Sequence, residues 1–227
     1  MFADPATATQ FPFGYRATMI TTLLLDVDGV LQFPRRPEFV DALERDHAWR
    51  DGYLAFQAEL FADPEYLATL SGRADVLAVT DRLLARHAPS LTGRAFMDRW
   101  LAEDIVLNGE LIAQVGELTV ERVYLATNQE PIRGAHVERL HAHPWLTGVF
   151  ASWQLGRAKP DPAYFERLLD ATGLPAAECL FVDDKEPLVA AARGVGLHAA
   201  HYTSNDLLLA EFRRYGLASA GEAPDQR

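Results

Sequence analysis

The sequence predicts an α/β fold, with a parallel sheet covered by helices on both faces and a helical lobe inserted after the first strand. Five short, nearly continuous apolar runs are typical of strands that are buried on both faces. From the second run onward, helix-like segments alternate with these runs, which indicates parallel strands. Between the first and second runs, apolar residues recur at helical spacing instead, as in "DVLAVTDRLLARHA" and "RAFMDRWLAED".

Each predicted element has a local signal. The predicted strands are Thr22–Asp26, Arg122–Ala126, Val149–Ser152, Cys179–Val182 and Leu197–His201. The helices predicted between them are Pro131–His141, Asp161–Thr172 and Glu186–Arg193. The second helix has the clearest ends, because Asp161 is a favourable N-cap, Pro162 suits the first turn and Gly173 suits the position after the last.

These elements divide the chain into four parts. Residues 19–32 and 118–217 form the predicted core domain, and residues 33–117 form the inserted helical domain. A structureless loop as long as this insertion is uncommon inside a compact domain, so we expect a helical lobe there. We interpret residues 1–18 as an N-terminal extension or the product of a start codon upstream of Met19, and residues 218–227 as a flexible tail.

Composition and charge exclude several classes of protein. The net charge is −11 and there is no basic run, which argues against a nucleic-acid partner. No apolar run approaches the ~20 residues of a membrane span, and the N-terminus does not resemble a secretory signal. The single cysteine, Cys179, excludes an intrachain disulfide and a zinc site built mainly of thiolates. We expect a cytoplasmic protein without membrane partners, as a monomer or homodimer.

Polar residues follow the predicted strands where their carboxyl ends should meet, which is where α/β sheets bind ligands. Two carboxylates ~4 Å apart repel by about 4 kcal/mol at an effective dielectric near 20, so acids gathered there call for a positive partner. Four acids beside a lysine favour a hard divalent cation such as Mg²⁺. A helix begins after the second strand, and its N-terminus would favour an anion. The converging residues are Asp26, Asp28, Thr127, Asn128, Lys159, Asp183 and Asp184.

Four motifs in order resemble the haloacid dehalogenase-like superfamily of hydrolases. They are "LLLDVDGVL", "VYLATN", "GRAKPDP" and "CLFVDDKEPLVAAARGVG", which together span Leu23 to Gly196. Each one falls at the end of a predicted strand. The resemblance implies a Rossmann-like core, and the insertion is similar to the C1-type α-helical cap of the family's capped phosphatases.

The resemblance also implies roles for the converging residues. Asp26 would be the nucleophile that forms an aspartyl phosphate, and Asp28 would protonate the leaving group and then activate water. Thr127 and Lys159 would complete the catalytic set, and Mg²⁺ would be the cofactor. The metal ligands would be Asp26, the Asp28 backbone carbonyl and Asp183, with Asp184 as a supporting or direct ligand. The substrate-binding residues would be Gly29, Thr127, Asn128 and Lys159.

The implied activity is Mg²⁺-dependent hydrolysis of a small phosphomonoester, such as a sugar phosphate or related metabolite. A 2-haloacid dehalogenase is the nearest alternative, but dehalogenases of this family lack the second acid, and Asp28 is present here. A phosphomutase uses the same acids and stays open, as does a non-catalytic module that binds phosphorylated ligands. A receiver-type signalling domain is disfavoured, because its phospho-acceptor acid belongs at the third strand, which ends here in Ser152.

Several further residues have ordinary structural explanations. The pair His141 and His143 has no evident third ligand, and Cys179 suits a small core position. The lobe contains arginines and aromatic residues for which packing and substrate contact both stay open. They are Arg35, Arg36, Trp49, Arg50, Tyr53 and Trp100. The chain also has Leu188 where relatives often have Asn, so a polar contact there is absent or is supplied by Lys185 or Glu186.

Overall fold

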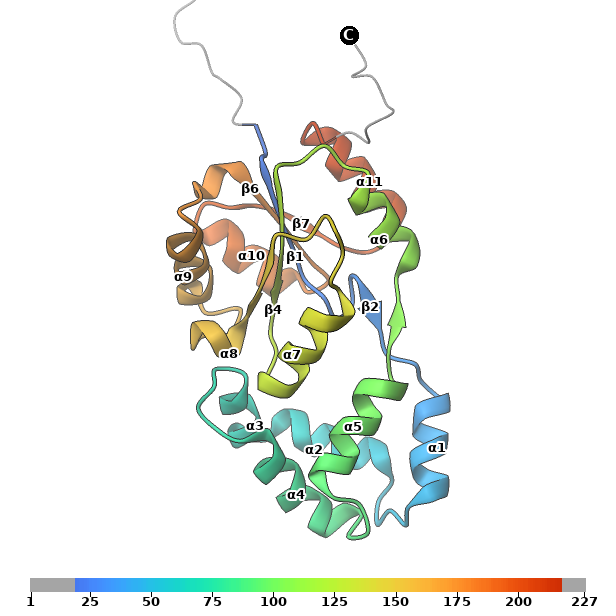
Figure 1. The fold of residues 1–227 in the computed structure, drawn as a ribbon. Coiled ribbons are helices and arrows are strands. Elements are labelled where there is room, and N and C mark those ends of the chain that lie inside the picture. The colour runs from blue at the N-terminus through green and yellow to red at the C-terminus, as the bar shows by residue number, and fades with distance from the viewer. Residues whose placement is uncertain (1–18, 218–227) are drawn as a thin grey trace, which may run out of the picture.

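The structure, a computed structural model, describes residues 19–217, so the predicted N-terminal extension and C-terminal tail lie outside the described residues. Figure 1 shows a sheet with helices on both sides and a separate group of helices at one end of it. This arrangement confirms the predicted fold class of a parallel sheet with helices and an inserted helical lobe.

The sheet has five parallel strands, and β1 lies at its centre. Its spatial order is β5 (Gly148–Ala151), β4 (Arg122–Thr127), β1 (Thr22–Leu25), β6 (Cys179–Asp183) and β7 (His198–His201). In register, Leu25 pairs with Leu125 of β4 and Val182 of β6. The residues that follow β1 therefore lie between the carboxyl ends of β4 and β6. This register places the acids after β1 beside those at the end of β6.

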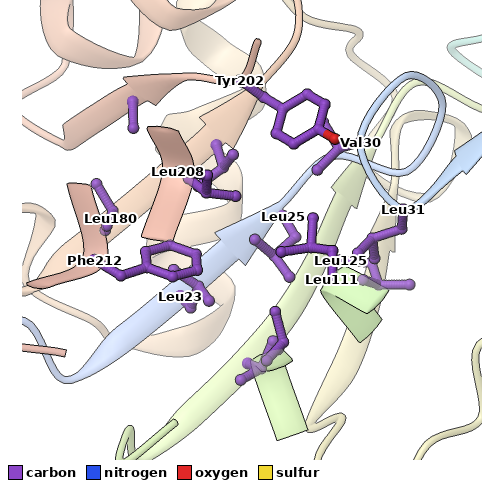
Figure 2. Close-up of a cluster of buried hydrophobic side chains, with 14 of the residues drawn as sticks. Leu23, Leu25, Val30, Leu31, Leu111, Leu125, Leu180, Tyr202, Leu208 and Phe212 are labelled. Atoms are coloured by element: carbon purple, nitrogen blue, oxygen red, sulfur yellow. The ribbon is translucent and has the colours of Figure 1, made fainter. Parts of the chain in front are cut away.

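Each face of the sheet has its own apolar cluster. Successive side chains of a strand point to opposite faces, so Leu23 and Leu25 join one cluster and Leu24 joins the other. In Figure 2, Leu111 and Phe212 lie beside these β1 leucines on the first face. The helices on that face are α6 (Gly109–Gly116), α7 (Pro131–Leu140) and α11 (Asn205–Arg214), and those on the other are α9 (Pro162–Thr172) and α10 (Glu186–Gly194).

The ends of α9 match their sequence signals. Asp161 is the N-cap and accepts a hydrogen bond from the backbone N–H of Ala163 at 3.0 Å. Gly173 follows the helix in the left-handed conformation, with φ +66°. The elements that were not predicted include α11, α8 (Ser152–Leu155) and the 3₁₀ turn Ala176–Glu178. Among residues 19–217, no helix combines the length and apolar composition that a membrane crossing requires.

The inserted lobe has a core of its own. Tyr53, Phe56 and Phe96 are fully or almost fully buried there and pack ring against ring, with centroids 5.1–6.3 Å apart. The packing of Tyr53 in this cluster is the structural explanation for that residue. The lobe's helices are α1 (Glu38–Asp46), α2 (Tyr53–Ala62), α3 (Pro64–Thr69), α4 (Val76–His87) and α5 (Gly93–Glu103).

A separate two-stranded antiparallel sheet joins the lobe to the main sheet. Its strands are β2 (Gln32–Phe33) and β3 (Val106–Leu107). Just after β3, the Asn108 side chain donates hydrogen bonds to the backbone oxygen of Val30 at 2.9 Å and to the Tyr202 hydroxyl at 3.1 Å. The chain is thus fixed to the sheet domain where it returns from the lobe.

Helix α6 packs with the sheet, although the sequence placed it in the inserted domain that ends at residue 117. Leu111 and Val115 are buried in the cluster on the first face of the sheet. The apolar stripe of α6 predicts a buried face but does not say which body covers it. We therefore place the end of the inserted domain at the two-stranded sheet of β2 and β3, before Asn108. The division into two domains otherwise stays a proposal.

Candidate active site

Lys159 lies between two carboxylates at the carboxyl edge of the sheet. Its Nζ is 3.0 Å from Asp26 Oδ1 and 2.6 Å from Asp183 Oδ2. The same ammonium donates to the backbone oxygen of Ala126 at 2.8 Å. All three ionisable side chains are buried, with Asp26 and Lys159 each 4% exposed and Asp183 fully covered. The lysine offsets part of the repulsion between acids that come from two neighbouring strands.

Asn128 holds the segment that carries Lys159. Its side-chain amide donates to the Lys159 backbone oxygen and accepts from the Lys159 backbone N–H, both at 2.8 Å. The predicted contact between Asn128 and substrate stays a prediction. The structure gives the Asn128 side chain a different task, which is to fix the backbone of Lys159 to the end of β4.

Three acids at this edge form a candidate metal site. Oxygen atoms of Asp26, Asp183 and Asp184 lie within 4.8 Å of one another. Asp184 Oδ1 is buried and has no hydrogen-bond partner among the described residues. When all three carboxylates are ionised, they and the Lys159 ammonium together carry a formal charge of −2. An all-oxygen donor set with this charge and an unpartnered oxygen fits a hard divalent cation such as Mg²⁺.

The second oxygen of Asp183 is held by the backbone. Asp183 Oδ1 accepts a hydrogen bond from the Lys185 N–H at 2.9 Å. This contact comes from one of the two residues that the sequence offered in place of the missing Asn, although it uses the main chain. Leu188 itself is buried in the apolar cluster on the second face. Asp184 is oriented by His201, whose Nε2 lies 2.9 Å from the Asp184 backbone oxygen.

Asp28 is surrounded by hydrogen-bond donors. Arg133 approaches both carboxylate oxygens, at 3.0 and 3.1 Å. Gln32 and Gln129 each donate from Nε2 at 2.7 Å, one to each oxygen. Arg133 also donates from Nε to Gln129 Oε1 at 3.0 Å, and its guanidinium lies 4.3 Å from the ring centroid of Trp100 in the lobe. Asp28 is therefore held as an ion pair where the sheet meets the helical lobe.

Gln32, Gln129 and Arg133 were not identified from the sequence. Gln129 immediately precedes Glu130, the N-cap of α7, and Arg133 lies in the first turn of this helix, so the two side chains meet where the helix begins. Gln32 is fixed from behind by His141, whose Nε2 lies 3.0 Å from Gln32 Oε1. That contact explains the buried His141 without a metal. The "TNQEPIR" segment held the signal, because it sets polar residues at helical spacing beside a strand end.

Thr127 is at the end of β4 and is almost fully buried. Its hydroxyl oxygen accepts a hydrogen bond from Gln129 Nε2 at 3.1 Å, which leaves the hydroxyl proton free for an anion. The N-terminus of α7 was expected to favour an anionic ligand, but a carboxylate of the chain itself takes this position. The N-cap is Glu130, whose carboxylate accepts from the Ile132 and Arg133 N–H groups at 2.6 and 2.7 Å. Neither Thr127 nor Asn128 caps this helix.

The two acids after β1 have opposite pKa shifts. Burial raises the pKa of Asp26 to about 6, although the Lys159 charge opposes the shift. Desolvation would also raise the pKa of Asp28, but the Arg133 charge and the hydrogen bonds from Gln32 and Gln129 outweigh it and hold that pKa below its usual value. The Asp26 carboxylate therefore lacks sufficient positive charge around it, whereas Asp28 is stabilised in its ionised form.

Gly29 lets the chain pass close to Asp184. Its φ is +89°, and a Cβ built there would lie 2.5 Å from both Cγ and Oδ2 of Asp184. A side chain at this position would displace the acid that has the unpartnered oxygen. This proximity places Gly29 at the site by a steric requirement. Its predicted role in substrate binding stays a prediction.

Residues 20–196 match a family model described as haloacid dehalogenase-like hydrolase. This chain is a member of that family. The match covers more than half of the chain and includes the strand ends that carry all the acids described above. The resemblance of the four motifs to this superfamily is therefore confirmed, while membership in its capped-phosphatase branch stays a proposal.

A curated relative of the hydrolase matches a smaller part of the chain than the family model does. A sesquiterpene phosphatase of Aspergillus oryzae is 37% identical over 94 residues, which are 40% of this chain and 47% of that protein. The chain thus spans about half the length of this curated relative.

Two solved structures show the shared fold. A family enzyme from Bacteroides thetaiotaomicron, an Asp-to-Ala variant in complex with magnesium and inorganic phosphate, has a TM-score of 0.66 at 18% identity, over 82% of this chain and 95% of that one. An L-2-haloacid dehalogenase from Xanthobacter autotrophicus has a TM-score of 0.60 at 21% identity, over 88% and 85%. The fold alone therefore does not distinguish phosphatase from dehalogenase activity.

We predict that Gly29→Ala weakens metal binding, whereas Gly173→Ala does not. Both glycines have positive φ, so each alanine should lower the free energy of unfolding by about 1–2 kcal/mol. Only at Gly29 would the new Cβ meet Asp184, because the space around Gly173 is open to 4 Å. Urea unfolding and calorimetric titration with Mg²⁺ would measure the two effects. Equal metal affinity in the two variants would contradict the assignment of Asp184 to the site.

We also predict a pH-dependent gain in stability from Asp26→Asn in the metal-free protein. The raised pKa means that Asp26 favours folding while it is protonated and loses this contribution as pH rises from about 3.8 through about 6. The asparagine does not titrate, and Lys159 keeps Asp183 as a partner. The variant should therefore gain on the order of 1–3 kcal/mol over the wild type across this range.

Asp28→Asn is the matched control for this measurement. The lowered pKa of Asp28 has the opposite sign, so this variant should lose stability relative to the wild type as pH rises toward 3.8. Urea unfolding in chelator from pH 3 to pH 7 would test both. A stability difference for Asp26→Asn that is flat from pH 4 to pH 7 would show that the burial of Asp26 does not disfavour its charge.

Proposed function

We propose that the hydrolase is a Mg²⁺-dependent phosphatase that cleaves a small phosphomonoester through an aspartyl-phosphate intermediate. The observation that carries this proposal is the position of two differently held acids at one strand end. Asp26 is buried against Lys159, and Asp28 lies two residues later with its carboxylate at the mouth of the site. Two carboxylates in different environments can perform nucleophilic and acid–base roles separately.

In the first step, a carboxylate oxygen of Asp26 attacks phosphorus, and the bond from phosphorus to the leaving oxygen breaks. Asp28 gives its proton to that oxygen. In the second step, Asp28 takes a proton from water, the water oxygen attacks phosphorus, and the bond to Asp26 breaks to release phosphate. Lys159 and the Thr127 hydroxyl stabilise negative charge on the phosphoryl oxygens.

The bound cation would contribute electrostatic stabilisation. Mg²⁺ held by Asp26, Asp183 and the Asp28 backbone carbonyl would neutralise charge on the phosphoryl group, with Asp184 as a direct or supporting ligand. The clustered carboxylate oxygens and the unpartnered Asp184 Oδ1 support this ligand set. The same cation would also favour the ionised form of Asp26, which burial alone disfavours.

Asp28 can act as an acid only after its contact with Arg133 changes. The guanidinium stabilises the ionised carboxylate, so proton uptake by Asp28 requires that this ion pair weaken. Arg133 also stacks on Trp100 of α5 in the lobe. Movement of the lobe as substrate binds would therefore alter the position of Arg133 and, through it, the protonation of Asp28.

Asp28 favours a phosphatase over the dehalogenase. Release of a halide needs no proton, so a dehalogenase has no use for an acid at this position, whereas departure of an alkoxide does. A phosphomutase would use the same two acids. Release of free inorganic phosphate from the substrate would distinguish the phosphatase from the mutase, and binding without turnover would indicate a non-catalytic module.

We predict that the protein releases phosphate from p-nitrophenyl phosphate only when Mg²⁺ is present. Chelation should remove this activity, and Mg²⁺ should restore it, because three clustered acids require a cation to accept an anionic substrate. Asp26→Asn should be inactive at all Mg²⁺ concentrations, with a circular dichroism spectrum like that of the wild type. Turnover by Asp26→Asn would exclude Asp26 as the nucleophile.

We predict that Asp28→Asn produces a burst of p-nitrophenolate followed by slow turnover. This leaving group departs without a proton, so the first step should persist while water activation is lost. Steady-state turnover should fall by about 10²- to 10⁴-fold, the usual contribution of a general base. Rapid-mixing absorbance would give a burst close to one equivalent per enzyme. A variant with wild-type turnover and no burst would remove Asp28 from the mechanism.

A further inference from the structure

A cavity of about 370 Å³ opens between the sheet domain and the lobe, with Asp28 in its wall. Its two walls differ in chemistry. The residues that the sheet domain contributes are all polar, and they are Asp28, Gln32, Asn128, Gln129, Arg133 and Lys185. The phosphate end of a substrate would lie on this side, next to Asp26 and Lys159.

The opposite wall, formed by the lobe and by the residues that enter and leave it, is mainly apolar. Its apolar side chains are Phe33, Phe61, Leu67, Leu70, Trp100 and Ile105. Phe61 and Leu67 are 42% and 50% exposed, which is unusual for large apolar residues that gather in one place. The ring of Phe61 lies 6.0 Å from that of Trp100, centroid to centroid, so these residues form one continuous surface. An apolar surface that lines a cavity beside catalytic groups indicates that the part of the substrate that lies against it is apolar too.

Few polar groups on this wall could bind hydroxyl groups. Arg36 and Asp104 are the charged residues that the lobe side contributes to the cavity. Asp104 Oδ2 accepts a hydrogen bond from Trp100 Nε1 at 3.2 Å, and Asp104 Oδ1 has no hydrogen-bond partner among the residues described. Tyr66, which carries a hydroxyl group, also lines the cavity. Three polar side chains beside a larger number of apolar ones favour a hydrocarbon group over a sugar, whose several hydroxyl groups need partners when buried.

We propose that the physiological substrate is the phosphomonoester of an apolar alcohol, with a hydrocarbon leaving group that lies against Phe61, Leu67 and Trp100. This inference rests on the proposed phosphatase activity and replaces the sugar phosphate expected from the resemblance. The leaving oxygen is next to Asp28 during reaction, and the cavity extends from Asp28 toward the apolar wall. The carbon chain attached to that oxygen therefore enters the apolar half of the cavity.

The decisive measurement is kcat/KM across a series of n-alkyl phosphates from methyl to decyl, compared with glucose 6-phosphate. Each methylene that leaves water should raise kcat/KM about fourfold until the cavity is filled. Octyl phosphate should therefore exceed methyl phosphate by at least 100-fold and should exceed the sugar phosphate as well. A flat response to chain length, or a preference for glucose 6-phosphate, would overturn the proposal.

Two leucine variants test whether the apolar wall is responsible for the dependence of kcat/KM on chain length. Leu67 on α3 lines the cavity, whereas Leu54 on α2 is a lobe leucine of similar exposure, 56%, that is outside the cavity lining. Leu67→Asn should lower the ratio of kcat/KM for octyl phosphate to that for methyl phosphate about tenfold. Leu54→Asn should leave this ratio unchanged. An equal change of the ratio in the two variants, or an unchanged ratio in Leu67→Asn, would mean that the apolar wall does not bind the chain.

A binding measurement separates this inference from the proposed activity. Octylphosphonate has no phosphate ester to cleave, so its affinity can be measured by calorimetry whether or not the protein is a phosphatase. We expect it to bind at least 100-fold more tightly than methylphosphonate, with a negative heat-capacity change. Binding without turnover of any phosphomonoester would refute the phosphatase and keep the apolar site. Turnover of sugar phosphates without octylphosphonate binding would refute the apolar site and keep the phosphatase.

Discussion

The ion pairs of Lys159 with Asp26 and Asp183 are the interaction on which the site depends. They join residues from the ends of β1 and β6 to a loop that follows β5, so they fix the relative positions of three separate segments. Removal of the Lys159 charge would leave both carboxylates without their cation in a buried site, which is strongly destabilising. Asn128 adds a second connection by binding the backbone of Lys159 to the end of β4. The parallel register explains why these residues meet, since it aligns the carboxyl ends of β4, β1 and β6.

This arrangement gives the two acids of β1 different electrostatic surroundings. Asp26 shares one ammonium with Asp183 and is raised in pKa by burial, so its charge is favourable only when a cation or a bound proton compensates. Asp28 has a guanidinium to itself and amide donors on both oxygens. The two acids are separated by a single residue, Val27, which is fully buried and whose backbone oxygen accepts hydrogen bonds from the turn that follows, at Val30, Leu31 and Gln32. Separate environments within one strand end are what a two-step displacement requires.

The sequence was sufficient for most of the sheet domain. Strand positions and helix ends depend on periodicity, Gly and Pro positions and capping residues, which are local, and Asp161 and Gly173 occur at the ends of α9 as predicted. The convergence of Asp26, Lys159 and Asp183 also followed, because parallel topology dictates where strand ends meet. The sequence predicted the structure less well where a side chain had more than one possible hydrogen-bond partner.

Asn128 and Glu130 are two side chains whose hydrogen-bond partners the sequence did not predict. Asn128 binds the Lys159 backbone, and Glu130 occupies the helix start that was expected to attract an external anion. The pattern of α6 could not show which body it packs against, and the roles of Gln32 and Arg133 depend on contacts between distant segments. Such contacts are set by tertiary packing, which residue spacing does not encode.

The position of Trp100 connects the two halves of the molecule. Its ring contributes to the apolar wall of the cavity, stacks on Arg133 and donates through Nε1 to Asp104. A group that lies against the apolar wall at Trp100 would therefore contact the residue that supports the partner of Asp28. Because the Arg133 charge lowers the pKa of Asp28, such a group would be coupled through this one indole to the acid–base role proposed for Asp28. The lobe would thus select the leaving group and, by the same contact, adjust the acid that protonates it.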